Sequence, residues 1–349
     1  MGLARSAYVK EGQEGVFHCF CRCVRRAFLC GIDPVTQRDY SHRKSWLVDR
    51  LRQLAAIFAI DVCAYAVMDN HYHTVLRTRP DLVALWSDRE VATRWLTLFP
   101  PHRRKKDKAN PPTDKQISAL AHNRKRIARL RKRLSSLSWF MGRLNEFIAR
   151  AANKEDDVTG RYWESRFKCL ALLDDAAIAA CMAYVDLNPI RAGLSASPEE
   201  SDFTSIQQRL RAWHQEMIEQ TSIAKRDTPI QAVSTPIPDS TDWLCPIRSE
   251  AQRRGILQIT TAEYFDLVDK SGRLLRSGKR GSIDADLAPI LLRVGIKPDA
   301  WVDTMSRFES RFRLAAGLLS SLRRFADQIG RKWLVGLTSA RTAFAASIQ

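Results

Sequence analysis

The fold of this chain is decided by the stretch Ala66-Val67-Met68-Asp69-Asn70-His71-Tyr72-His73-Thr74-Val75-Leu76. Apolar residues on both sides of Asp69-Asn70 predict two strands joined by a tight turn, because Asp and Asn favour turns. On a strand, residues i and i+2 face the same side, so we expect the imidazoles of His71 and His73 to project together. Two imidazoles held in this way suit one shared metal ion.

The segments around this hairpin predict a small α+β domain. Val16 to Leu29 alternates in character and indicates a first strand, while Ser41 to Phe58 has helix-spaced apolar residues behind a cap candidate, Ser41. Ile60 to Met68 and His71 to Arg77 supply the two strands of the hairpin. A strand-helix-strand-strand order predicts an antiparallel sheet with helices on one face.

A second informative segment is Ala183-Tyr184-Val185-Asp186-Leu187-Asn188-Pro189-Ile190-Arg191. Asp174 is a good N-cap for a helix through this segment, and Pro189 predicts that the helix ends or bends near Leu187 to Asn188. Residues four apart on a helix are neighbours, so Tyr184 and Asn188 should share a face. A tyrosine hydroxyl beside a bound metal suits attack on a phosphodiester.

Together these two segments resemble the HUH single-tyrosine transposases, and more closely the REP-associated tyrosine transposase-like group. The resemblance extends roughly from Tyr8 to Leu210 and includes the segment Gly160-Arg161-Tyr162-Trp163-Glu164-Ser165-Arg166-Phe167-Lys168. It implies the HUH endonuclease fold, a ferredoxin-like antiparallel sheet with helices. It also implies that Tyr184 cuts single-stranded DNA at hairpins of palindromic repeats, leaving a 5′-phosphotyrosine link and a free 3′-OH for rejoining.

The resemblance implies a divalent metal ion, Mg²⁺ or Mn²⁺, bound by His71, His73 and the amide oxygen of Asn188. Imidazole ligands favour Mn²⁺ by ligand type. If Asn188 only ends the helix, one ligand is missing. The residues do not identify the acceptor of the Tyr184 proton, for which a metal-bound water is one option.

Other tyrosines compete with Tyr184 as the nucleophile. They are Tyr65, Tyr72 and Tyr162. Strand alternation turns Tyr72 away from the histidine face, whereas Tyr162 is the reserve candidate.

The chain carries a formal net charge of +18, which favours a polyanionic partner. Between His102 and Arg133 stand thirteen Lys and Arg against two Asp, and Ile117 to Ala152 predicts a long basic amphipathic helix or a helical pair. Cations next to a phosphodiester-cutting site suit DNA phosphates, although such runs are often only a solvated face. The expected DNA contacts are Arg191, Arg166, Lys168, Arg124, Lys125, Arg126, Arg129, Lys132 and Arg133.

Eight cysteines include the run Cys19, Cys21 and Cys23. Zinc sites usually use a wider cysteine spacing, so the run predicts a strand with three small apolar side chains on one face. We expect reduced thiols in a cytoplasmic, nucleoid-associated protein. No stretch approaches the roughly 20 apolar residues of a membrane span, so no membrane partner is expected.

Three parts of the chain are predicted. Residues 1–212 form the transposase-like domain with a basic helical insertion at about 100–153, residues 213–240 a linker, and residues 241–349 a helical C-terminal domain of unknown role, with DNA binding as one option. Relatives act as monomers and as dimers, so a homodimer stays open.

Two other functions remain in competition. One is a domesticated, non-catalytic DNA-binding protein that keeps the fold and the basic surface. The other is a metal hydrolase whose nucleophile is water, which would survive the replacement of Tyr184 by Phe.

Overall fold

The computed structural model describes residues 3–24, 30–33, 36–101, 111–224, 241–277 and 286–345. Its strands are β1 (Gly15–Arg22), β2 (Ile60–Val67), β3 (His71–Thr78), β4 (Lys168–Leu172) and β5 (Ala315–Ala316). The helices up to residue 224 are η1 (Arg5–Ala7), α1 (Arg43–Ile57), α2 (Pro80–Leu85), α3 (Asp88–Leu98), α4 (Asp114–Ala121), α5 (Arg124–Leu134), α6 (Leu137–Glu155), α7 (Asp175–Asp186), α8 (Asn188–Arg191) and α9 (Ser205–Ala224). Those that follow are α10 (Thr261–Ser277), α11 (Leu287–Arg293), η2 (Pro298–Ala300), α12 (Trp301–Ser306), α13 (Phe308–Arg311), α14 (Leu319–Gln328) and α15 (Leu337–Ala343).

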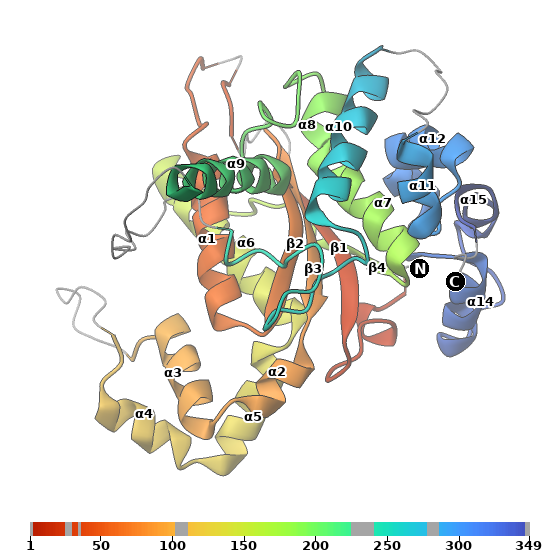
Figure 1. The fold of residues 1–349 in the computed structure, drawn as a ribbon. Coiled ribbons are helices and arrows are strands. Elements are labelled where there is room, and N and C mark those ends of the chain that lie inside the picture. The colour runs from red at the N-terminus through yellow and green to blue at the C-terminus, as the bar shows by residue number, and fades with distance from the viewer. Residues whose placement is uncertain are drawn as a thin grey trace.

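The five strands form one sheet in the order β2-β3-β1-β4-β5 (Figure 1). The first four pair antiparallel, in the order of a ferredoxin-like sheet, and the short β5 is added parallel to β4. Between β2 and β3 the chain turns at Asp69-Asn70, and the Met68 N–H donates to the His71 carbonyl over 2.8 Å. The predicted antiparallel sheet and its hairpin turn are therefore confirmed.

Helices cover both faces of this sheet, and the prediction of helices on one face was wrong. On one face Tyr72 donates to the Asn145 side chain of α6 over 2.6 Å. On the other face the ring of His73 meets Tyr184 of α7, with ring centroids 5.8 Å apart. The reason lies in α7, in which every residue from 176 to 186 is buried. A helix that is apolar all round must be enclosed, so the sheet covers one side of it and C-terminal helices the other.

Strand β1 places its cysteines and its polar residues on opposite faces. Cys19, Cys21 and Cys23 are all buried, and Cys21 stands opposite Tyr72 on the face covered by α6. Burial raises the pKa of Cys21 and of Cys23 to about 12. The run is therefore a set of buried apolar side chains, as predicted. The alternate residues, His18 among them, face α7.

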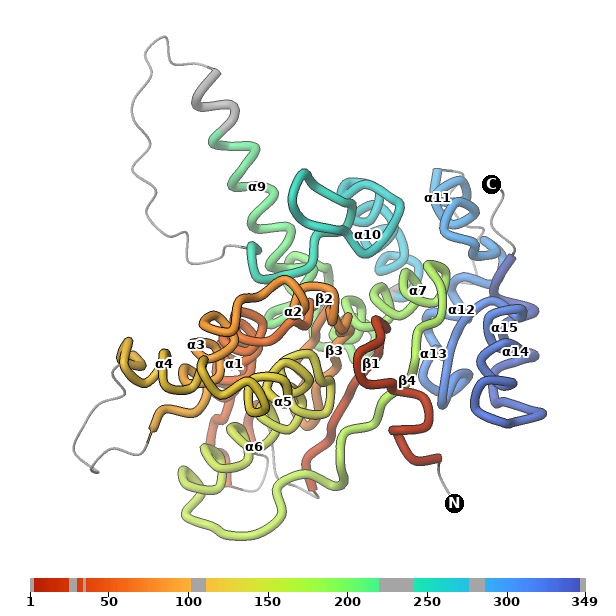
Figure 2. Tube along the Cα trace, turned by 90° about the horizontal axis from the view of Figure 1, so that it is seen from below, coloured from red at the N-terminus to blue at the C-terminus, as the bar shows by residue number. Residues whose placement is uncertain are grey.

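The basic insertion is three helices, α4, α5 and α6, where one long helix or a pair was predicted. Side-chain caps start new helices inside it, since Thr113 caps α4 and Asn123 caps α5. The Ala59 N–H donates to the Leu134 carbonyl over 2.9 Å, which holds α5 at the C-terminal end of β3 (Figures 1 and 2). Part of the predicted basic run, residues 102–110, lies outside the described residues.

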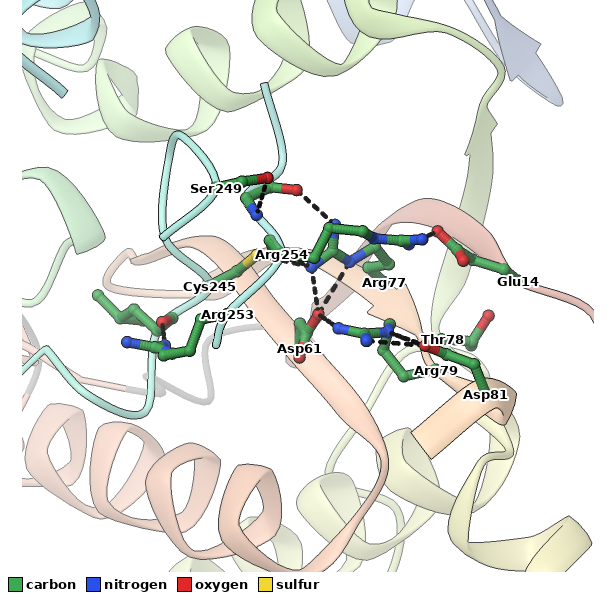
Figure 3. A network of polar contacts seen from close by, with 12 residues as sticks. Glu14, Asp61, Arg77, Thr78, Arg79, Asp81, Cys245, Ser249, Arg253 and Arg254 are labelled. Atoms are coloured by element: carbon green, nitrogen blue, oxygen red, sulfur yellow. Dashed lines mark hydrogen bonds and ion pairs between the residues drawn. The ribbon is translucent and has the colours of Figure 1, made fainter. Parts of the chain in front are cut away.

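The C-terminal residues pack directly on the sheet. The Ala171 N–H of β4 donates to Leu314, and the Cys245 N–H donates to Val62 of β2. Figure 3 shows a further anchor, in which Arg77 of β3 donates both to Asp61 and to the Arg254 carbonyl.

Residues 213–224, predicted as the start of a linker, continue the helix α9, and residues 225–240 lie outside the described residues. The helical character predicted for the C-terminal part is present in α10 to α15. No helix in the described ranges has both the length and the apolar content that crossing a bilayer requires.

Candidate active site

The first element of the site is the pair His71 and His73 at the start of β3. Their ring centroids lie 4.9 Å apart on one face of the sheet. Each ring is held through its Nδ1 atom. In His71 this atom lies 2.6 Å from Asn70 Oδ1, and in His73 it lies 2.9 Å from His18 Nε2. At the Nε2 atoms the structure shows no hydrogen bond to any described residue. A histidine with one nitrogen engaged and the other free has the form of a metal ligand.

His18 is a part of this site that the sequence did not reveal. It lies on β1, and its ring stacks on His73 with centroids 5.1 Å apart. Burial lowers the pKa of His18 to about 3 and of His71 to about 4, and it lowers the pKa of His73 well below the ordinary value. All three imidazoles are therefore neutral near pH 7, as a metal ligand must be.

The structure brings Tyr184 against these rings. Asp174 caps α7 by accepting the Ala177 N–H over 3.1 Å, and the helix then carries Tyr184 to within 5.8 Å of His73 and 5.9 Å of His18, centroid to centroid. The Tyr184 hydroxyl donates to Glu309 Oε2 over 3.1 Å. Burial first, and then the Glu309 charge, raises the pKa of Tyr184 to about 12, while Arg191 opposes the shift.

Asn188 and Arg191 belong to α8, the short helix after Tyr184. Arg191 lies over the Tyr184 ring at 4.4 Å and donates from Nη2 to the Ser306 carbonyl over 2.7 Å. Its Nη1 atom is buried without a hydrogen-bond partner among the described residues, and so is Nδ2 of Asn188. Because amide O and N positions are interchangeable assignments, the free position at Asn188 also suits an oxygen ligand.

A cavity of about 1290 Å³ opens beside the tyrosine. Tyr184 and Phe20 line it, and both rings contact His73. Its lining residues include six cations, Arg5, Arg166, Lys168, Arg191, Arg307 and Arg313, and one acid, Glu309. Three of the predicted DNA contacts, Arg166, Lys168 and Arg191, are thus brought together at this cavity. The remaining cations come from the N-terminal segment and from the C-terminal part.

The other predicted DNA contacts lie elsewhere. Arg124, Lys125, Arg126, Arg129 and Lys132 are exposed on α5, at the end of β3 away from His71. Eight strand residues separate the two ends by roughly 24 Å. Arg133 is half-buried and lies over the Trp139 ring at 4.4 Å.

The competing tyrosines lie away from the histidines. Tyr65 donates to Gln208 over 3.0 Å and Tyr72 to Asn145 on the opposite face of the sheet. Tyr162 packs edge-on against Trp163, with centroids 4.9 Å apart, and Trp163 is buried. Of the tyrosines considered as nucleophiles, Tyr184 is the one in ring contact with His73.

The described residues contain no group of three or more His, Cys, Asp and Glu side chains arranged to hold a metal ion. A metal ion at this place would therefore have to be held by the two free imidazole nitrogens together with an amide or backbone oxygen. This donor set of two nitrogens and one oxygen suits Mn²⁺ and leaves positions open for phosphate oxygens.

Known proteins give no support for this geometry at the level of sequence. No family model matches the chain, and no curated protein matches it. One solved structure, described as "Structure of the REP associates tyrosine transposase bound to a REP hairpin", is similar over 67% of this chain and 96% of that chain. The similarity is distant, with a TM-score of 0.32 and 11% sequence identity.

Proposed function

We propose that this protein is a metal-dependent transposase that cuts and rejoins single-stranded DNA through a 5′-phosphotyrosine intermediate. One observation carries the proposal. The ring of Tyr184 contacts His73 of the histidine pair and also lines a cavity with six cations. A nucleophile, two free imidazole nitrogens and a phosphate-binding surface are the parts that phosphodiester transfer requires.

The residues of the chain would divide the work in the following way. The cations of the cavity hold the DNA backbone, and the unpartnered Nη1 of Arg191 reaches a phosphate oxygen next to the Tyr184 ring. A divalent cation held by the Nε2 atoms of His71 and His73 and the Asn188 amide would stabilise negative charge on the scissile phosphate. Tyr184 Oη then attacks phosphorus, and the 3′ oxygen leaves.

The likeness of the two motifs to REP-associated transposases motivates the choice of substrate, which is single-stranded DNA with a hairpin from a palindromic repeat. A strand end released with a free 3′-OH could attack the phosphotyrosine, so rejoining needs no further energy source.

A second candidate is a non-catalytic DNA-binding protein. The observation that favours it is the state of the nucleophile, since Tyr184 is 5% exposed and its hydroxyl is bonded to Glu309. In that case the cavity would bind DNA without forming a covalent product.

The test is incubation of the wild type and of Tyr184→Phe with labelled single-stranded hairpins from the host's repeats, in Mn²⁺ or Mg²⁺. We expect a denaturant-resistant adduct with the wild type that is absent from Tyr184→Phe and is abolished by EDTA. Salt-sensitive binding without an adduct, for several hairpins and both metals, would establish the binding protein instead. Cleavage without an adduct that persists in Tyr184→Phe would indicate a water nucleophile.

A further inference from the structure

Two residues of α13 in the C-terminal part, Phe308 and Glu309, contact Tyr184. Figure 2 shows α13 beside α7, the helix of Tyr184. The Phe308 ring lies 5.9 Å from the Tyr184 ring, and the Ser306 carbonyl accepts from Arg191. A few residues later, the Leu173 N–H donates to Ala316 over 2.9 Å at the sheet edge. Contacts on both sides of Glu309 therefore fix its position against Tyr184.

The carboxylate of Glu309 forms no ion pair with any residue in the described ranges. Although Arg307 and Arg311 flank it in the sequence, both pair with Asp303. No ion pair of Glu309 itself is found among the residues that the structure describes, and its one hydrogen bond there is the one donated by the Tyr184 hydroxyl. The Tyr184 hydroxyl donates its hydrogen bond to the Glu309 carboxylate. Both residues line the cavity, so this hydrogen bond lies where a phosphate would enter.

We infer that Glu309 is a catalytic residue, the general base that takes the phenolic proton as Tyr184 attacks. The inference rests on the proposed function and gives the C-terminal part a role in the chemistry. The bond formed is Tyr184 Oη–P and the bond broken is P–O3′. The phenolic proton moves to Glu309 Oε2, the departing 3′ oxygen takes a proton from water, and Glu309 returns its proton to the solvent. A positioned carboxylate within 2.6 to 3.2 Å of the proton donor meets the geometric requirement for a general base.

The test uses full-length Glu309→Gln, Glu309→Asp and Glu309→Ala, with Glu219→Gln as a control that removes the same charge from an exposed position on α9. Adduct formation is measured in single turnover with the labelled hairpin at saturating DNA and Mn²⁺. Glutamine keeps an oxygen that accepts the hydroxyl hydrogen bond but cannot take the proton. We expect it to slow adduct formation about 10²- to 10⁴-fold, without any loss of hairpin affinity. Aspartate should retain part of the rate.

Added formate supplies the second readout. It should restore adduct formation in Glu309→Ala, where the side chain is missing, and should not do so in Glu309→Gln, where the amide fills the space. A rate in Glu309→Gln equal to or above that of the wild type would overturn the role of Glu309 while leaving the phosphotyrosine mechanism intact. A wild type that forms no Tyr184-dependent adduct would instead overturn the proposed function and this inference together.

Discussion

At the scale of single residues, the site depends on which nitrogen of His73 carries the proton. His73 Nδ1 lies 2.9 Å from His18 Nε2, so one of these atoms must donate to the other. If His73 donates, its Nε2 is left as a lone pair and can bind a metal. If His18 donates, the His73 Nε2 carries the proton and cannot. The proposed function requires the first arrangement, which makes His18 a positioning residue for the metal ligand.

Replacing His18 by Phe tests this role, because an aromatic ring is kept and only the nitrogens are lost. We expect the Mn²⁺ concentration for half-maximal adduct formation to rise about 10- to 100-fold, as for other outer ligand partners, with a smaller effect at saturating Mn²⁺. His42→Phe is the matched control, since His42 is an exposed histidine paired with Glu155 on another surface. An unchanged Mn²⁺ dependence in His18→Phe would show that His73 needs no partner.

At the scale of secondary-structure elements, Asp186 joins three helices. It lies at the C-terminal end of α7 and is fully buried, and its carboxylate accepts from Ser205 of α9 and Tyr264 of α10. Burial raises the pKa of Asp186 to about 6 from an ordinary 3.8. The folded state therefore binds this proton more tightly than the unfolded chain does. The stabilisation from this group is full below about pH 4 and is lost as pH rises through about 6.

Asp186→Asn cannot titrate, so it isolates this effect. The free energy of unfolding of the wild type minus that of Asp186→Asn should increase as pH falls from about 7 to about 4, by at most about 3 kcal/mol. Urea unfolding at several pH values measures the difference. A difference that stays flat over this range would mean that Asp186 titrates in the folded protein as it does in the unfolded chain.

The same elements show why sequence reasoning reached some parts of the molecule and not others. The β2–β3 hairpin and the Asp174 cap depend on residues that are close together in the sequence, so they could be predicted. The signals are alternating apolar residues, turn-forming residues and a capping side chain. For the basic insertion a helical pair was one of the two predictions, but the positions of the breaks before α5 and α6 were not predicted because an apolar stripe continues across them. His18 and Glu309 were missed for another reason. His18 reaches His73 only through the register of β1 against β3, and Glu309 lies 125 positions from Tyr184 along the chain.

At the scale of the whole molecule, two of the places where cations gather among the described residues bear on DNA binding. One is the cavity beside Tyr184, and the other is the exposed face of α5 at the far end of β3. A separation of roughly 24 Å along the strand means that α5 cannot touch the phosphate that is cut. Cations at that distance can only hold DNA that extends beyond the site, so the two surfaces should contribute to different measurable quantities.

The triple variant Arg126→Gln, Arg129→Gln and Lys132→Gln separates these contributions. If the three cations contact phosphates, the slope of log affinity against log salt concentration should become shallower by about 2 to 3, at roughly 0.7 to 0.9 for each lost contact. The rate of adduct formation at saturating DNA should not change, because α5 lies away from Tyr184. The matched control is Arg323→Gln, Arg324→Gln and Arg331→Gln, which removes the same charge from exposed positions near α14. A salt slope of the α5 variant equal to that of the wild type would show that α5 carries a solvated basic face, and that these three cations do not hold the DNA.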